Sequence, residues 1–165
     1  MPKSSKLPCN WLIAVSSGLV VHELEHHAAQ EVARQRRRQR FATDQRRGWP
    51  SHTTNGQGYM LTADTMTYFH DHYIPDKAMD LDWRASPLLH PDLSKLPPAL
   101  VLTAGYDPLR DEALQYSHKL TMAGNRCTHI LFERQIHGFI TMGKVIDEAN
   151  TAVQICAAEL RRALA

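Results

Sequence analysis

The fold is decided by a short apolar run near the middle of the chain, Ala99-Leu100-Val101-Leu102-Thr103-Ala104, which ends at Gly105. A run of this length without alternating polar residues is typical of a strand that is buried on both faces of a parallel sheet. Such a sheet needs helices on its two faces. We therefore expect a strand over residues 99–104, with helices before and after it.

The sequence after this strand continues the same pattern. A helix is predicted over 108–123, with Asp107 as its N-cap, Pro108 at its first position and Gly124 as its stop. A second strand is predicted over 128–133, and a last helix over 144–164. Apolar residues recur along that helix every three or four positions and predict one buried face: Ile146, Ala149, Val153, Cys156, Leu160 and Leu164.

The sequence before the strand contains one further clear helix and a loop. Residues 62–74 are predicted to be helical, with Thr62 or Asp64 as the cap, and Pro75 ends the helix. Residues 84–98 contain four prolines and are predicted to be a loop. The order strand, helix, strand, helix with short turns predicts an α/β fold, in which a parallel sheet is flanked by helices.

Composition and charge limit the possible functions. The chain has 165 residues, a mean hydropathy of −0.39 and no apolar run near 18 residues, so we expect one domain without a membrane span. The three cysteines, Cys9, Cys127 and Cys156, form no obvious pairs, which favours reduced thiols and a cytoplasmic location. Cys156 is expected to be buried and inert.

Three stretches of different character divide the chain. Residues 1–30 hold a short apolar run and a His/Glu cluster, residues 31–56 are rich in arginine and glutamine, and residues 57–165 hold the α/β pattern. Seven arginines lie between Arg34 and Arg47. They could contact phosphates, but no aromatic residues accompany them, so we expect a poorly packed linker or exposed helix that binds no nucleic acid.

Two polar residues follow the two predicted strands directly. Asp107 comes three residues after the first strand, and His137 comes shortly after the second, 30 residues later. Functional residues of parallel sheets gather at the carboxyl ends of strands, so these side chains can meet there. An aspartate that orients a histidine is the acid–base half of a Ser-His-Asp triad. The simpler alternative is a helix cap and an unrelated loop histidine.

Three motifs in this region resemble one branch of a known family. Gly105-Tyr106-Asp107-Pro108-Leu109-Arg110-Asp111-Glu112, Ile136-His137-Gly138-Phe139 and Gly58-Tyr59-Met60-Leu61-Thr62 resemble, in order and spacing, the hormone-sensitive-lipase-like α/β-hydrolases. The resemblance runs from about residue 56 to the end, the C-terminal half of such a domain. It implies hydrolysis of a small carboxylic ester without a metal or organic cofactor, with Asp107 as the triad acid and His137 as the general base.

The upstream half of the family pattern is incomplete. No G-x-S-x-G sequence, the form of the family's nucleophile turn, occurs in the chain, so the nucleophile is unknown. Val15-Ser16-Ser17-Gly18 replaces the family's His-Gly-Gly-Gly oxyanion loop, and residues 1–30 are a divergent remnant in which only Gly18 is kept. We expect a shortened esterase relative that is inactive alone. Missing strands would also leave a sheet edge exposed for self-association.

Two alternatives from other classes of protein remain open. Some relatives in the family keep the ligand pocket and have lost catalysis, so the chain could be a non-catalytic ligand-binding protein. Separately, His22-Glu23-Leu24-Glu25-His26 fits H-E-x-x-H, in which both histidines can hold zinc on one helix face and Glu23 can act as the base of a peptidase. No third ligand follows at the spacing of metzincins, which makes this second alternative the weaker one.

Overall fold

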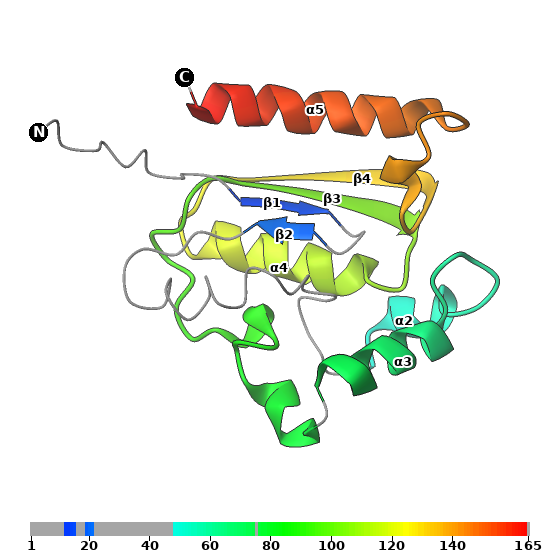
Figure 1. The fold of residues 1–165 in the computed structure, drawn as a ribbon. Helices are drawn as coiled ribbons and strands as arrows, with labels where there is room; N and C mark the ends of the chain where they lie inside the picture. Colours follow the sequence, from blue (N-terminus) through cyan, green and yellow to red (C-terminus); the bar gives the residue numbers. More distant parts are fainter. Residues whose placement is uncertain (1–11, 16–18, 22–47, 75, 165) are drawn as a thin grey trace, which may run out of the picture.

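The computed structural model describes residues 12–15, 19–21, 48–74 and 76–164. They form a four-stranded sheet in the order β2-β1-β3-β4 (Figure 1). The strands are β1 (Leu12–Val15), β2 (Leu19–Val21), β3 (Ala99–Tyr106) and β4 (Cys127–Ile136). β3 is parallel to both β1 and β4, which confirms the predicted parallel sheet, whereas β2 runs antiparallel to β1.

Three described helices, α3, α4 and α5, lie where the sequence pattern predicts them, with shifted ends, and α2 lies in the segment expected to be a linker. They are α2 (Pro50–Thr54), α3 (Ala63–Tyr73), α4 (Arg110–Met122) and α5 (Asp147–Leu164), with short 3-10 helices η1 (Lys77–Leu81), η2 (Pro87–Leu89) and η3 (Phe139–Thr141). The Thr62 hydroxyl accepts a hydrogen bond from the Thr65 backbone N–H, so Thr62 is the cap of α3. No described helix is long and apolar enough to cross a bilayer.

The sheet separates two apolar layers, and both are covered by helices. On one face Leu100 and Leu102 of β3 pack with Phe139 and with Ala149 and Ala152 of α5. On the other face Ala99 packs with Tyr116 and Leu120 of α4 and with two leucines of the 84–98 loop. Figure 1 shows α5 above the strands and α4 below them. The α/β sandwich expected from the strand–helix order is therefore present.

The first turn of α4 differs from the prediction. The helix begins at Arg110, with Leu109 in the N-cap position, rather than at Pro108 with Asp107 as the cap. One Asp107 oxygen accepts the Leu109 backbone N–H and the other contacts His137, so the carboxylate closes a turn ahead of the helix. The turn takes the place of the first helical positions, and in it the Asp107 carboxylate contacts both the Leu109 backbone N–H and His137.

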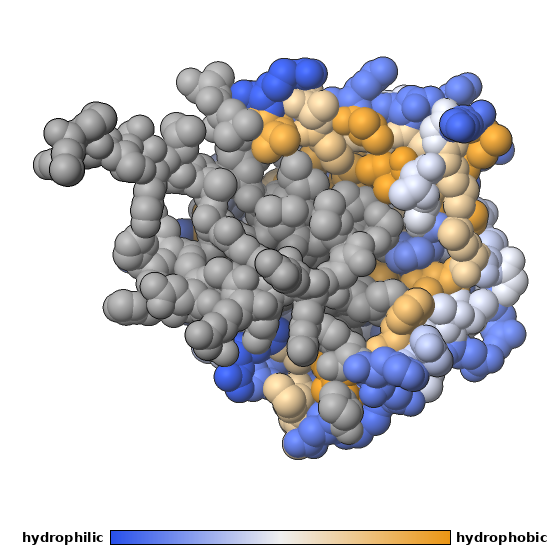
Figure 2. Space-filling view, viewed as in Figure 1, coloured by the Kyte–Doolittle hydropathy of each residue, from blue (hydrophilic) through white to orange (hydrophobic). Residues whose placement is uncertain are grey.

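The buried face of α5 is also rotated from the predicted one. Ala149 and Ala152 are fully buried, whereas Val153 is 50% exposed and Leu160 is 44% exposed. One residue is about 100° around a helix, so centring the contact on Ala152 turns Val153 toward solvent. Cys156 is half-buried rather than buried, and burial raises the pKa of its thiol. Figure 2 shows apolar residues on the surface of this helical layer.

The segment before α3 is better packed than expected. The prediction of a poorly packed linker over 31–56 is wrong for its last residues, because Ser51, Asn55 and Gly56 are buried. They pack against the loop after β3 and the start of α4, so that their polar groups are paired rather than solvated. Residues 31–47 lie outside the described part of the chain. The contacts of α2 therefore join residues 50–56 to the C-terminal part of the chain, whereas the predicted division had placed them in the linker.

Stability is expected to fall when the pH is lowered from 7 to 5. Burial and the neighbouring His118 hold the pKa of His129, on β4, below its usual value. A histidine kept neutral by the fold takes up a proton more readily after unfolding, so acid favours the unfolded chain below about pH 6.5. Urea unfolding across this range should show a smaller pH dependence in His129→Gln than in the parent. The matched control, His72→Gln at an exposed site, should keep the parent's dependence, and equal slopes in all three proteins would contradict the assignment.

Candidate active site

The carboxyl ends of β3 and β4 are brought together by a backbone contact at Gly105. The register of the two strands shifts between Ala104 and Tyr106. A Cβ atom added to Gly105 would lie 1.9 Å from the Glu133 carbonyl oxygen and 2.6 Å from its carbon. Only glycine permits this approach. Residues 105–109, which comprise the last two residues of β3 and the turn after it, are called the acid loop below, because Asp107 lies in this segment.

Asp107 and His137 meet where the two strands end. The Asp107 Oδ2 atom lies 2.9 Å from the His137 Nδ1 atom, as predicted from their places after successive strands. Asp107 is fully buried, and its Oδ1 atom accepts the Leu109 backbone N–H at 2.9 Å. The His137 side chain is 14% exposed. A buried carboxylate is stable only with such partners, so the pair is held as a unit.

The contact with Asp107 fixes the state of the imidazole. A carboxylate only accepts hydrogen bonds, so Nδ1 of a neutral His137 carries the proton and Nε2 keeps a free lone pair. The next residue, Gly138, has a φ of 76°, in the left-handed region that favours glycine, and it starts the turn into η3. The chain turns away directly after His137. Nε2 can therefore act as a proton acceptor, which is the task of a general base.

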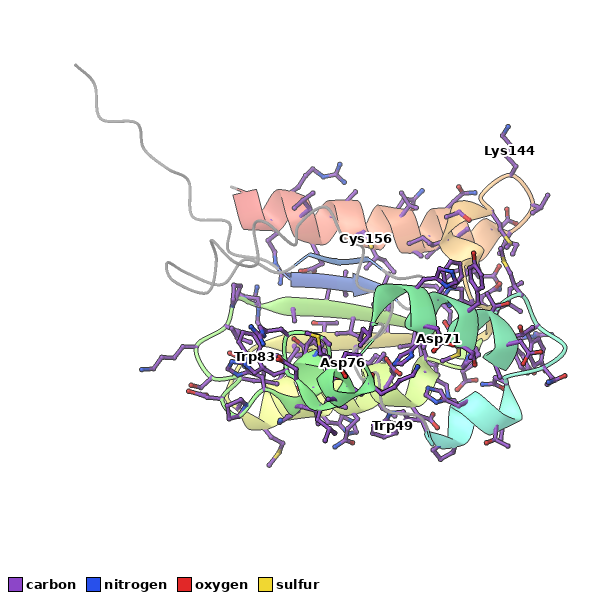
Figure 3. All side chains as sticks on the ribbon, turned by 60° about the horizontal axis from the view of Figure 1, so that its bottom comes forward. Trp49, Asp71, Asp76, Trp83, Lys144 and Cys156 are labelled. Atoms are coloured by element: carbon purple, nitrogen blue, oxygen red, sulfur yellow. The ribbon has the colours of Figure 1, made fainter. Side chains whose placement is uncertain are left out.

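Helix α2 supports the acid loop from outside the motif. The Asn55 side-chain amide donates to the carbonyl oxygens of Gly105 and Asp107, at 3.1 and 3.2 Å. Ser51 donates its hydroxyl to the Pro108 carbonyl oxygen, and its backbone N–H donates to the Asp111 carboxylate. Figure 3, in which Trp49 is labelled just before α2, shows this helix beside α4. Neither Asn55 nor Ser51 was predicted to belong to the site, since both lie in the segment expected to be a linker.

An aromatic and apolar surface lies next to the pair. The Tyr59 and Tyr106 rings have centroids 4.9 Å apart, and Tyr106 is 42% exposed. Met60 is 60% exposed, and its sulfur would be 3.6 Å from a Cβ atom at Gly138. Two of the three motif segments used for the resemblance, those around Tyr59 and His137, are therefore neighbours in space. Apolar side chains of this kind can receive the alkyl or aryl part of a small ligand.

Other residues singled out in the sequence lie outside the described part of the chain. This applies to Ser16, Ser17 and Gly18, and to the H-E-x-x-H histidines His22 and His26 with Glu23. Within residues 48–74 and 76–164, no serine hydroxyl is hydrogen-bonded to His137, and three of the four serines there are buried elsewhere: Ser51, Ser86 and Ser117. The same residues hold no group of three metal-ligating side chains.

A parallel sheet between helical layers, with an aspartate and a histidine paired after successive strands, defines the class of α/β hydrolases. The family model described as "alpha/beta hydrolase fold" matches residues 24–141. The chain belongs to this family, and within it to the hormone-sensitive-lipase-like esterases that its motifs resemble.

Curated relatives and solved structures agree on this family. An ethyl acetate hydrolase from Pseudomonas putida is 36% identical over 115 residues, which are 70% of this chain and 36% of that protein. The carboxylic ester hydrolase LipN from Mycobacterium tuberculosis is 41% identical over 88 residues, 53% of this chain and 23% of that protein.

Solved structures match a similar share of the chain. An ester hydrolase from the metagenome of Lake Arreo has a TM-score of 0.68 at 40% identity, covering 71% of this chain and 37% of that one. An esterase from Pyrobaculum calidifontis gives 0.68 at 36% identity, covering 75% and 42%. This chain thus spans about a third of the length of the curated relatives it matches and about two fifths of the solved ones.

Proposed function

We propose that this chain carries the acid and the general base of a carboxylic ester hydrolase. The observation that carries the proposal is the 2.9 Å contact between Asp107 and His137 at the carboxyl ends of neighbouring strands. In ester hydrolysis His137 would take the proton of an attacking hydroxyl at Nε2, and Asp107 would orient the ring and stabilise the imidazolium that forms. A small ester is the substrate class that the relatives' names support, and no cofactor is required for this chemistry.

The chain is proposed to be an incomplete catalytic unit. A Ser-His-Asp mechanism needs a nucleophile next to the base and an oxyanion hole, and the sequence contains no G-x-S-x-G turn. Gly18 is the proposed remnant of the oxyanion loop. Removing one oxyanion donor typically costs about 10²–10³ in rate, and the nucleophile and base act as a unit. We therefore propose that the chain alone does not hydrolyse esters through an acyl-enzyme.

Measured hydrolysis of p-nitrophenyl acetate is expected to be no faster for the purified chain than for its His137→Ala variant. The variant is the right reference because it keeps the other nine histidines, whose imidazoles hydrolyse activated aryl esters slowly. A fluorophosphonate probe, which labels activated serines, should leave the chain unlabelled. Stoichiometric labelling of any serine that is lost in His137→Ala would show a working esterase and overturn the proposed inactivity.

Location and partners follow as further proposals. Cys127 and Cys156 are free thiols in the described part of the chain, which supports a reducing compartment such as the cytoplasm. Among the described residues, β4 has a neighbouring strand, β3, on one edge only. Its other edge could pair with a strand of a second copy, which supports the proposed self-association. The net charge of +2 favours no nucleic-acid partner.

A further inference from the structure

We infer that Asn55 is a positioning residue for the Asp107–His137 pair, acting through the backbone of the acid loop. The inference rests on the proposed function, because it assigns a role within the same site. It is carried by three observations: the two hydrogen bonds that Asn55 donates, its burial, and the independent fixing of α2 against α4.

The Asn55 amide holds the acid loop at two points on either side of Tyr106. Its Nδ2 atom donates to the carbonyl oxygen of Gly105, at the end of β3, and to that of Asp107 itself. Both acceptors are carbonyls, so the amide can present only its NH₂ group to them. One donor group therefore bridges these two carbonyls and helps to fix the backbone that carries the Asp107 side chain.

Burial makes this contact costly to lose. Asn55 is 6% exposed and Asp107 is fully buried, so water does not readily replace the amide. Without Asn55, the Gly105 carbonyl oxygen would still accept a hydrogen bond from the Arg110 guanidinium. The Asp107 carbonyl oxygen would still accept one from the Arg110 backbone N–H. Both remaining donors belong to the residue that starts α4. The loop would thus keep its hydrogen bonds to α4 and the one from the Ser51 hydroxyl to the Pro108 carbonyl oxygen, and it would lose the two contacts on either side of Tyr106.

Asn55 is itself held in place by contacts that do not involve the acid loop. The Ser51 backbone N–H donates to the Asp111 carboxylate at 2.9 Å, and the Ser51 hydroxyl accepts the Asp111 backbone N–H at 3.2 Å. The Asn55 backbone N–H donates to the Ser51 carbonyl oxygen at 3.0 Å. Because these contacts anchor α2 to α4, Asn55 reaches the acid loop from a fixed base, as a residue that supports a catalytic group must do.

The test measures the imidazole of His137 directly and needs no turnover. In the full chain at pH 8 and low temperature, solvent exchange of the His137 Nδ1–H proton and the ring ¹⁵N signals are recorded by NMR. Asn55→Ala is expected to speed this exchange about tenfold, comparable to the loss of one hydrogen bond, and to populate the other tautomer. Failure of the proposed esterase role would leave this result unchanged, so the two ideas fail separately.

The matched control is Asn125→Ala, another buried asparagine clamp. Asn125 is 8% exposed, donates to the Leu93 and Leu120 carbonyls and accepts the Leu96 backbone N–H, at the far end of α4. Its loss should destabilise the chain and leave His137 exchange within twofold of the parent. Asn55→Leu, which keeps about the same side-chain shape and removes the donor without burying a charge, should behave as Asn55→Ala does.

The outcomes separate positioning from simple structural support. Folded Asn55 variants with parent-like His137 exchange would overturn the inference, as would equal acceleration in Asn125→Ala. If both Asn55 variants fail to fold while Asn125→Ala folds, Asn55 is a structural residue and the positioning role is rejected.

Discussion

A chimera in which residues 48–165 replace the matching segment of the Pseudomonas putida ethyl acetate hydrolase is expected to hydrolyse short-chain esters. In this chimera His137→Ala should lower kcat/KM on the order of 10⁴–10⁶-fold, because the host supplies the nucleophile and the graft supplies its base. The two chains are 36% identical over the aligned 115 residues, which makes the exchange structurally conservative. The measurement is the initial rate with p-nitrophenyl acetate.

The acid should show a separate and nearly as large effect. Asp107→Asn keeps the size of the side chain but presents an amide to Nδ1, which favours the wrong tautomer and should cost about 10⁴-fold in kcat. His72→Ala, at an exposed position on α3, is the control and should retain the chimera's rate. An active chimera that is indifferent to His137→Ala would show that the pair does not act as acid and base.

Gly105→Ala is expected to destabilise the fold by about 3 kcal/mol, at the upper end of what overpacking costs. The new methyl group would overlap the Glu133 carbonyl, which is part of the backbone of β4 and cannot rotate away. The strands would have to separate next to the site, so the Asp107–His137 contact should lengthen as well. Urea unfolding measures the first effect, and the His137 ring signals report the second.

Gly124→Ala provides the matched comparison. Gly124 has a φ of 85° with open space around its Cβ position, so alanine there suffers only the left-handed backbone, at roughly 1–2 kcal/mol. Gly105 does not have a left-handed backbone conformation, but the Glu133 carbonyl leaves no space for a Cβ atom there. A loss of stability in Gly105→Ala no greater than in Gly124→Ala would refute the close-approach explanation.

The sequence was sufficient to predict the elements whose signals are local. The apolar run 99–104 lies within β3, and the motif around Asp107 and His137 correctly placed the two side chains together. Proline, glycine and cap residues marked most helix ends within a few residues. These features depend on neighbours along the chain, and a single sequence contains that information.

Features that depend on distant partners could not be predicted. Asn55 and Ser51 gain their roles from residues 50 to 60 positions away, and nothing in their own segment distinguishes them from linker residues. The exposed Val153 shows the same limit, because periodicity predicts a helix face but not which residue of it meets the sheet. The start of α4 was misplaced for a related reason, because the contacts of Asp107 with Leu109 and His137 close a turn ahead of the helix.

The placement of α2 has a consequence for the order in which this molecule assembles. The paired residues of β3 and β4 are 28 to 30 positions apart, whereas the contacts of α2 with the acid loop and α4 join residues 50 to 60 apart. Doubling the length of a closing loop costs about 0.6 kcal/mol of chain entropy. The strand–helix–strand unit is therefore expected to form first, and α2 to dock onto it last. When the folded chain unfolds locally, α2 is therefore expected to detach from the acid loop before β3 and β4 separate.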